Sequence, residues 1–207
     1  MGLGKVIARN LKQPTGLFGK LVGMFMNNRN DFMNRFTIRH LDPQKDDHIL
    51  EIGFGNGKYL KEIANLADHG LVAGIDISEI MVKEAQRRNK TLINRGNVDI
   101  KLGAVNKIDY DTHTFDKVFT VNTIYFWPNP ETDLQEIYRV LKPNGILVIS
   151  FRSEETMEKL KFTNYDFKLY NPEEVVQFVS DAGFHNITLE SSQDKSMDVH
   201  CVIARKA

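Results

Sequence analysis

The sequence predicts an α/β fold: a mostly parallel sheet with helices on both faces, closed at one edge by an antiparallel hairpin. Two observations predict the parallel part. Short apolar runs alternate with helix-period segments, as in successive β-α-β units, and the runs at residues 49–52, 115–122 and 146–151 are rich enough in apolar side chains for strands buried on both faces. A third observation predicts the hairpin, because only residues 192–195 separate two strand-like segments at the C-terminus.

The composition suits one domain with balanced charge. The 207 residues include 27 Lys and Arg against 27 Asp and Glu, so net charge favours neither a nucleic-acid-binding protein nor an acidic one. Residues 1–40 carry seven basic residues and one acidic residue. This basic arm either rests as a solvated helix face on the acidic remainder or contacts nucleic acid, a membrane surface or an acidic partner.

Cysteine usage and hydropathy limit the location of the protein. A single cysteine, Cys201, suits a reducing compartment, so a cytoplasmic location is expected. No apolar run approaches the roughly 18 residues that a membrane span needs. We expect neither a membrane span nor a metal site, and the oligomeric state is left open.

The elements follow in chain order. Helices are predicted at residues 3–12 and from residue 17 to about residue 41, and these define an N-terminal helical arm, residues 1–42, ahead of a domain at 43–207. Strands are predicted at residues 48–52, 70–75, 98–102, 115–122, 146–151, 184–191 and 196–205. Further helices are predicted at residues 59–66 and after the N-caps Ser78, Asn129 and Asn171, and a turn at residues 142–145.

A glycine-rich turn joins the first strand to the first helix of the domain. Gly53, Gly55 and Gly57 stand at alternate positions after the apolar run. Glycine lets a ligand approach the backbone because no Cβ intervenes, and the helix that follows offers free N–H groups to an anion. The dinucleotide-binding fingerprint needs a glycine where Lys58 stands, so a nicotinamide-dependent dehydrogenase is disfavoured.

The pattern Glu-x-Gly-x-Gly-x-Gly, which starts at Glu51, resembles motif I of the class I S-adenosylmethionine-dependent methyltransferases. Further stretches similar to motifs of this family follow in order: Gly74-Ile75-Asp76-Ile77-Ser78, Leu102-Gly103-Ala104-Val105, Phe115-Asp116-Lys117-Val118 and Arg139-Val140-Leu141-Lys142-Pro143-Asn144-Gly145. The resemblance runs from about His48 to the C-terminus. Within the family, the sequence is similar to the quinone-biosynthesis and related small-molecule methyltransferases. It implies the seven-stranded Rossmann-like methyltransferase sheet, S-adenosylmethionine as cofactor, and methyl transfer to a small aromatic or apolar acceptor.

The resemblance also implies the cofactor-binding residues. Asp76 suits the ribose diol, because an ionised carboxylate accepts two O–H hydrogen bonds. Glu51 would accept hydrogen bonds from its own loop or from the cofactor's ammonium group. Ile77 and Met81 would enclose the adenine, although Met81 is equally explained as helix core. The whole expected set is Glu51, Gly53, Phe54, Gly55, Asn56, Gly57, Asp76, Ile77, Met81, Ala104, Val105 and Asn122.

One position departs from the family. Many members carry an acidic residue where Ala104 stands, and that residue contacts the adenine amino group. In this chain the contact would come from backbone groups or another side chain.

The acceptor would lie against the end of the fourth strand. The expected aromatic wall is the stretch Asn122-Thr123-Ile124-Tyr125-Phe126-Trp127, from which Tyr125 and Trp127 are selected as substrate-binding residues. Phe32 and Phe36 would complete the wall if the arm is a lid. All four rings are also compatible with ordinary packing. Methyl transfer needs a base only if the acceptor must first lose a proton. The candidates for that base are His40, which is equally expected as a surface group, and Tyr125.

Two other functions remain open from the sequence. The basic arm would allow a methyltransferase that acts on RNA or protein, with salt-sensitive binding to nucleic acid. The fold would also serve a cofactor-binding domain without catalysis, because fold does not settle function. A small-molecule acceptor is the leading expectation.

Overall fold

The computed structural model describes residues 30–160, 163 and 167–207. The helix predicted at residues 3–12 and the first part of the helix predicted from residue 17 lie outside the described residues. The described part of the second helix is α3, Asp31–Leu41, which ends where the sequence predicted.

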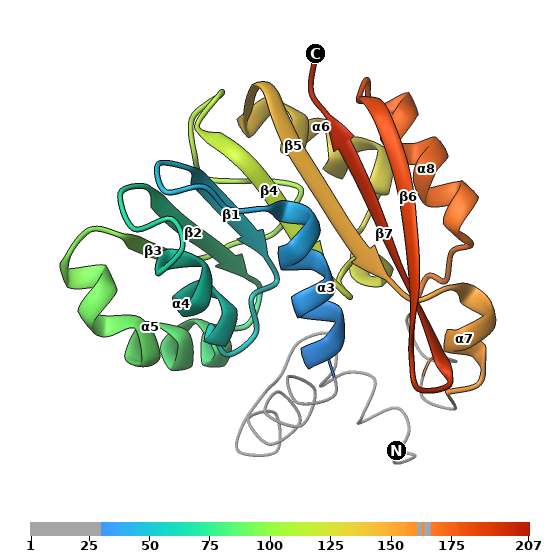
Figure 1. Ribbon diagram of the computed structural model, residues 1–207, viewed down its shortest axis with the longest axis horizontal. Coiled ribbons are helices and arrows are strands. Elements are labelled where there is room, and N and C mark those ends of the chain that lie inside the picture. Colours follow the sequence, from blue (N-terminus) through green and yellow to red (C-terminus); the bar gives the residue numbers. More distant parts are fainter. Residues whose placement is uncertain (1–29, 161–162, 164–166) are drawn as a thin grey trace.

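Seven strands form one sheet in the order β3-β2-β1-β4-β5-β7-β6 (Figure 1). Their bounds are β1 His48–Ile52, β2 Leu71–Asp76, β3 Val98–Leu102, β4 Phe115–Val121, β5 Leu141–Phe151, β6 His185–Asp194 and β7 Met197–Arg205. Strands β1 to β5 pair in parallel, whereas β7 pairs antiparallel with both β5 and β6. The predicted mostly parallel sheet with a C-terminal antiparallel hairpin is confirmed.

The helices of the domain are α4 Lys58–Ala64, α5 Glu79–Asn94, α6 Pro130–Val140, α7 Glu154–Glu158 and α8 Pro172–Asp181. Three of them, α5, α6 and α8, begin at the caps that the sequence indicated. Ser78 and Asn129 accept hydrogen bonds from backbone N–H groups in the first turns of α5 and α6, and Asn171 forms a capping box with Glu174. Helix α7 and the short 3₁₀-helix η1, Ile124–Phe126, were not predicted. No helix in the described part of the chain is long and apolar enough to cross a bilayer.

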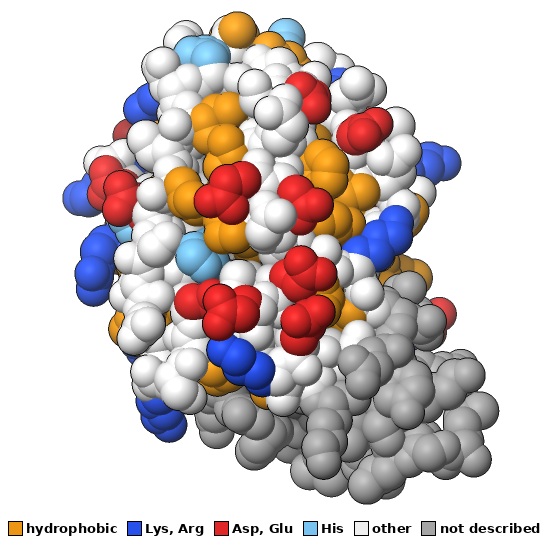
Figure 2. Space-filling model, turned by 90° about the vertical axis from the view of Figure 1, so that its right-hand side faces the viewer, with side chains coloured by type: hydrophobic (Ala, Val, Ile, Leu, Met, Phe, Trp, Pro, Cys, Tyr) orange, Lys and Arg blue, Asp and Glu red, His pale blue; other side chains and the backbone are white. Residues whose placement is uncertain are grey.

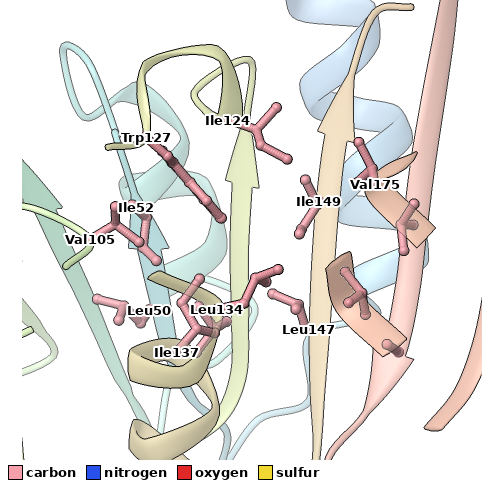
Figure 3. Close-up of a cluster of buried hydrophobic side chains, with 14 of the residues drawn as sticks. Leu50, Ile52, Val105, Ile124, Trp127, Leu134, Ile137, Leu147, Ile149 and Val175 are labelled. Carbon is pink, nitrogen blue, oxygen red and sulfur yellow. The ribbon is translucent and has the colours of Figure 1, made fainter. Parts of the chain in front are cut away.

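Two apolar layers cover the sheet. Helices α3, α4 and α5 lie on one face, and α6 and α8 lie on the other (Figure 1). Successive strand residues point to opposite faces, so Ile49 packs with the first layer and Leu50 with the second, and both are fully buried. Figure 3 shows the second layer, where Leu134 and Ile137 of α6 lie over the strands.

The predicted turn at residues 142–145 is instead part of β5. Leu141 already pairs with Phe115, and the register then shifts before Lys117 pairs with Ile146. Asn144 takes a left-handed backbone conformation within this irregular stretch, with φ of 64°. The turn-forming residues therefore bend a strand without ending it.

The long edge strand β6 is largely exposed. It carries Glu190 and Asp194, and acidic side chains gather on this side of the molecule (Figure 2). Charges on an edge strand oppose pairing with a further strand, so this edge is protected against association through the backbone.

Candidate functional site

A cavity of about 240 Å³ lies beyond the carboxyl ends of β1, β2 and β4. Strand β1 is central, with β2 and β3 on one side and β4 and β5 on the other. A ligand site is expected at such a switch point of an open parallel sheet, because the loops diverge there. The loops after the strands and the N-terminal end of α3 supply the described walls.

The glycine turn after β1 has a left-handed backbone at all three glycines, with φ of 76° at Gly53, 57° at Gly55 and 69° at Gly57. A Cβ on Gly53 would lie 2.4 Å from Cγ2 of Thr123, and one on Gly57 would lie 2.6 Å from Cβ of Ala85. Gly53 thus allows the turn to approach the end of β4, and Gly57 allows α4 to pack on α5. The glycines were expected to make room for a ligand, and the structure shows that two of them are also required by protein contacts.

Asp76 ends β2 with its carboxylate buried at the cavity. One oxygen accepts a hydrogen bond from the Gly55 N–H at 3.0 Å, and the other accepts one from the Ser78 N–H at 2.9 Å. Burial raises the pKa of Asp76 to about 6, and the two backbone hydrogen bonds oppose that shift. Asp76 therefore fixes the glycine turn while it presents acceptor lone pairs to a ligand.

Glu51 lies in β1 and lines the same cavity, with 3% of its surface exposed. Its Oε2 atom meets no hydrogen-bond donor in the described residues. Burial, together with the negative charge of Asp76, raises the pKa of Glu51 to about 8. A buried carboxylate without a partner is costly, so this atom calls for a positively charged or hydrogen-bonding ligand group.

The residues expected around the adenine come together. Ile77, Met81, Ala104 and Val105 all line the cavity, with Ile77 partly exposed at its rim. They provide an apolar surface on the β2 and β3 side, which suits a flat heterocycle. Met81 is at once cavity wall and helix core, so both readings of the sequence apply to it.

Of the other residues expected to bind the cofactor, some line the cavity and two do not. Phe54 and Asn122 line the cavity, as do Gly53 and Gly55. Asn56 and Gly57 are not among the lining residues. The Asn56 side chain instead accepts a hydrogen bond from the Lys58 N–H at 3.1 Å, at the start of α4. The geometry therefore supports a role for Asn56 and Gly57 in shaping the turn.

Of the rings predicted for the aromatic wall, Trp127 lines the cavity, whereas Tyr125, Phe32 and Phe36 do not. The indole N–H of Trp127 donates to Oγ1 of Thr123 at 3.1 Å, which fixes the ring. Phe126, which belongs to the predicted aromatic stretch but was not selected as a substrate-binding residue, also lines the cavity. Phe126 is the last residue of the 3₁₀-helix η1 and Trp127 follows it. Successive side chains of such a helix lie about 120° apart.

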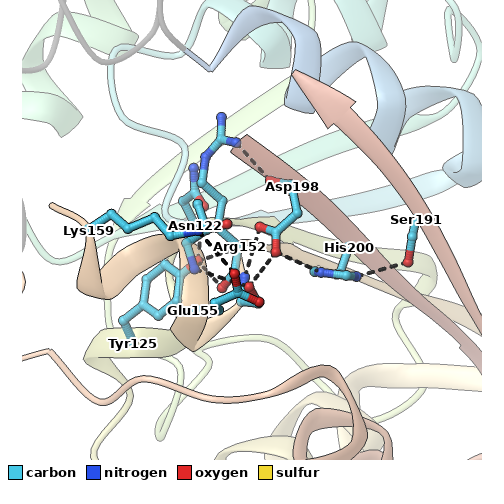
Figure 4. Close-up of polar contacts among 10 residues, drawn as sticks. Asn122, Tyr125, Arg152, Glu155, Lys159, Ser191, Asp198 and His200 are labelled. Atoms are coloured by element: carbon cyan, nitrogen blue, oxygen red, sulfur yellow. Dashed lines mark hydrogen bonds and ion pairs between the residues drawn. The ribbon is translucent and has the colours of Figure 1, made fainter. Parts of the chain in front are cut away.

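Tyr125 is not among the residues that line the cavity, and its side chain lies beside Asn122 and Arg152 (Figure 4). Its hydroxyl accepts a hydrogen bond from the Arg152 N–H at 2.6 Å and lies 3.1 Å from the Arg152 carbonyl oxygen and 3.3 Å from Oδ1 of Asn122. Burial raises the pKa of this hydroxyl above its ordinary range, which makes it a poor base near neutral pH. The catalytic and substrate-binding roles predicted for Tyr125 have no support from its placement.

Helix α3 faces the cavity with a different side from the one predicted. Phe32, Phe36 and His40 are four residues apart and share one side of the helix, where Phe32 stacks on Phe36 and Phe36 meets His40 edge-on. None of the three lines the cavity, whereas Asn30 and Asn34 do. The sequence offered one signal for Asn34, a polar residue on the apolar face of an amphipathic helix.

The described residues fit the cofactor that the resemblance implies. The unpaired oxygen of Glu51 suits its ammonium group, the Asp76 carboxylate suits its ribose hydroxyls, and the apolar wall suits its adenine. Glu51, Asp76 and the surface around Met81 would therefore hold S-adenosylmethionine, with the glycine turn beside it.

Comparisons with known proteins agree with this fit. A family model described as a methyltransferase domain matches residues 50–149. The chain is 29% identical to the uncharacterized methyltransferase YdaC of Bacillus subtilis over 90% of this chain and 98% of the relative. It is 30% identical to the ubiquinone/menaquinone biosynthesis C-methyltransferase UbiE of Hydrogenovibrio crunogenus over 80% of this chain and 68% of the relative.

The solved structures agree on the fold. A crystal structure of a SAM-dependent methyltransferase from Aquifex aeolicus is similar with a TM-score of 0.70 and 24% identity, over 84% of this chain and 89% of that one. At this identity the likeness shows the fold, and the closer sequence relatives show the family. The chain belongs to the class I S-adenosylmethionine-dependent methyltransferases, in the quinone-methyltransferase-like branch.

Proposed function

We propose that this enzyme methylates a small, uncharged aromatic acceptor, of which a hydroquinone ring is the leading example. The observation that carries the proposal is the composition of the cavity wall. Among the described lining residues, Glu51 and Asp76 carry the carboxylates, and none is a Lys, Arg or His. An anionic acceptor would therefore meet no cationic side chain in this described wall, whereas a flat neutral ring would pack beside Phe126 and Trp127.

Bound S-adenosylmethionine supplies an electrophilic methyl group. The chain's own contribution is to bind and align. Asp76 and Glu51 would anchor the polar ends of the cofactor, and the aromatic wall would hold the acceptor ring in one plane and exclude water. Alignment of this kind contributes roughly 7–11 kcal/mol to lowering a barrier. No side chain of the wall is assigned as a base, so an acceptor that is already nucleophilic, such as an electron-rich ring, suits the site.

The relative named as a ubiquinone/menaquinone C-methyltransferase supports this acceptor class. We also propose that residues 1–42 act as an arm beside the cavity and residues 43–207 as the catalytic domain. Helix α3 supports a close association of the two, because Asn34 lines the cavity and the Thr37 hydroxyl donates to Oγ of Ser150 on β5 at 2.7 Å.

The experiment has two steps. Calorimetric titration with S-adenosylhomocysteine, with NAD as control, tests the cofactor. Transfer of labelled methyl groups is then measured to a soluble hydroquinone, to the same ring bearing a carboxylate, and to bulk tRNA. Labelling of the neutral hydroquinone in preference to its carboxylated analogue is expected. Preference for the charged analogue would contradict the proposal, and labelling of tRNA alone would favour the alternative of a nucleic-acid substrate docked by the basic arm.

A further inference from the structure

Three donors converge on the carboxylate of Asp31, the first residue of α3. Oδ1 accepts hydrogen bonds from the Tyr59 hydroxyl at 2.7 Å and from Nζ of Lys58 at 2.8 Å. Oδ2 accepts one from Nε of Arg35, one turn further along α3, at 2.8 Å. These bonds hold the pKa of Asp31 far below its usual range, so the group stays ionised at neutral pH.

Two of the three donors come from another helix, α4. Lys58 and Tyr59 open α4, directly after the glycine turn, and Tyr59 lines the cavity. On α3, the neighbours Asn30 and Asn34 line the cavity as well. Asp31 therefore joins the N-terminal ends of two helices at points where both contribute to the cavity wall.

The start of α3 has few other described side-chain bonds to hold it in place, so the contact of Asp31 with α4 matters for its position. Asn30 stands at the N-cap position, but its side chain makes no capping hydrogen bond. The side-chain amide of Asn34 donates a hydrogen bond to the backbone carbonyl oxygen of Asn30 at 2.9 Å. The start of the helix thus lacks the usual side-chain cap. The described hydrogen bonds that tie it to α4 are those of Asp31, and a longer ion pair of 3.9 Å joins Arg35 to Glu62.

We infer that Asp31 is a positioning residue that holds the N-terminal end of α3 against α4 and so keeps the wall of the cofactor cavity closed. The inference concerns retention of the cofactor and does not depend on the identity of the acceptor. The contacts are partly exposed, with Lys58 32% and Asp31 37% accessible at the side chain. Exposed ion pairs add little to global stability. Their loss is therefore expected to change cofactor release much more than unfolding.

The test uses the full chain and S-adenosylhomocysteine, with no acceptor. Asp31→Asn should raise the dissociation rate constant, measured by stopped-flow displacement, by about tenfold, which corresponds to about 1.4 kcal/mol. Its melting temperature should stay close to that of the wild type. Arg35→Ala is the matched control. It removes a bond to the same carboxylate. Its own contact with α4 is a 3.9 Å ion pair with Glu62, and its side chain is 58% exposed, so the dissociation rate should change less than about twofold.

A second variant isolates the contact between the helices. Tyr59→Phe removes only the hydroxyl that donates to Asp31, and should raise the dissociation rate by about threefold. In the variant that carries both Asp31→Asn and Tyr59→Phe the two effects should be less than additive, because the first substitution weakens the hydrogen bond that the second removes. The single variant Tyr59→Phe also keeps the test decisive if Asp31→Asn folds poorly.

The outcomes separate clearly. Wild-type dissociation rates in both Asp31→Asn and Tyr59→Phe would overturn the inference and leave the proposed function intact. An equal effect of Arg35→Ala would show that any loss of charge on α3 suffices, and would also overturn it. Failure of the wild type to bind S-adenosylhomocysteine would overturn the cofactor assignment together with this inference. A wild-type cofactor affinity without activity on hydroquinones would contradict only the proposed acceptor.

Discussion

Glu51 and Asp76 present two buried carboxylates to one cavity from neighbouring parallel strands. Glu51 pairs with Gly74 across the β1–β2 ladder, and Asp76 lies two residues further along β2. Asp76 is stabilised by two backbone N–H groups, whereas Oε2 of Glu51 has no donor in the described part of the chain. The pair is therefore asymmetric, and the pKa of Glu51 is raised to about 8 while that of Asp76 is raised to about 6.

This asymmetry predicts how the stability of the cofactor-free protein depends on pH. Glu51 holds its proton more tightly in the folded state, with a pKa of about 8, than in the unfolded state, where the ordinary value is 4.5. Its contribution to the free energy of unfolding is therefore fully present below about pH 4.5 and is lost as the pH rises toward 8. Denaturant unfolding from pH 5 to 8.5 should show this decline, and Glu51→Gln should reduce it. Parallel profiles for the two proteins would contradict the burial of an unpaired carboxyl group.

Asp76→Asn tests the role of the second carboxylate. The variant keeps the shape of the side chain but removes the charge that would accept hydrogen bonds from the ribose diol. Charged hydrogen bonds of this kind contribute roughly 1.5–3 kcal/mol, so affinity for S-adenosylhomocysteine should fall by about tenfold or more. Asp109→Asn, on an exposed side chain outside the cavity, is the control. An unchanged dissociation constant in Asp76→Asn would refute the assignment.

Gly53 and Gly96 form a matched pair for separating backbone strain from crowding. Their φ angles are 76° and 79°, so alanine at either position is strained to a similar degree. A Cβ would meet Cγ2 of Thr123 at Gly53, but nothing within 4 Å at Gly96. Gly53→Ala should therefore cost about 1–3 kcal/mol more in the free energy of unfolding than Gly96→Ala.

The same clash offers a rescue experiment. Thr123→Ser removes Cγ2 and keeps the hydroxyl that accepts from Trp127. In the Gly53→Ala background this second substitution should restore part of the lost stability. If it restores none, the contact between the glycine turn and the end of β4 is not what requires glycine at this position.

The sequence predicted the sheet because its physical signals are local. Strands buried on both faces give continuous apolar runs, and helix starts need side-chain caps, which Ser78, Asn129 and Asn171 supply. The stretch at residues 142–145 was misjudged because a proline, an asparagine and a glycine indicate a turn equally well when they bend a strand. Pairing across the sheet decides between these outcomes, and pairing is not a local property.

The site residues that could be predicted from the sequence are those whose positions follow from the order of the strands. Glu51 and Asp76 lie in or at the ends of parallel strands, and such ends meet at one edge of the sheet. The aromatic wall and the side of α3 that faces the cavity depend on rotation of a helix about its axis. At the end of β4, Phe126 lines the cavity in place of the predicted Tyr125. At α3, Asn30 and Asn34 line it in place of Phe32 and Phe36. Only packing against the sheet sets that rotation.

Tyr125 and Trp127 should respond differently to removal of their polar groups. In Tyr125→Phe the buried Arg152 N–H loses its acceptor, which should cost about 1–3 kcal/mol in the free energy of unfolding. Because Tyr125 does not line the cavity, the KM for the acceptor and kcat should stay near wild type.

Trp127→Phe removes a donor to Thr123 and part of the cavity wall, so the KM for the acceptor should rise several-fold while affinity for S-adenosylhomocysteine is kept. Unfolding curves, calorimetry and initial rates on the same preparations distinguish the two. A large fall in kcat for Tyr125→Phe at unchanged stability would instead identify its hydroxyl as part of the chemistry, and would require Tyr125 to leave its contact with Arg152 when the acceptor binds.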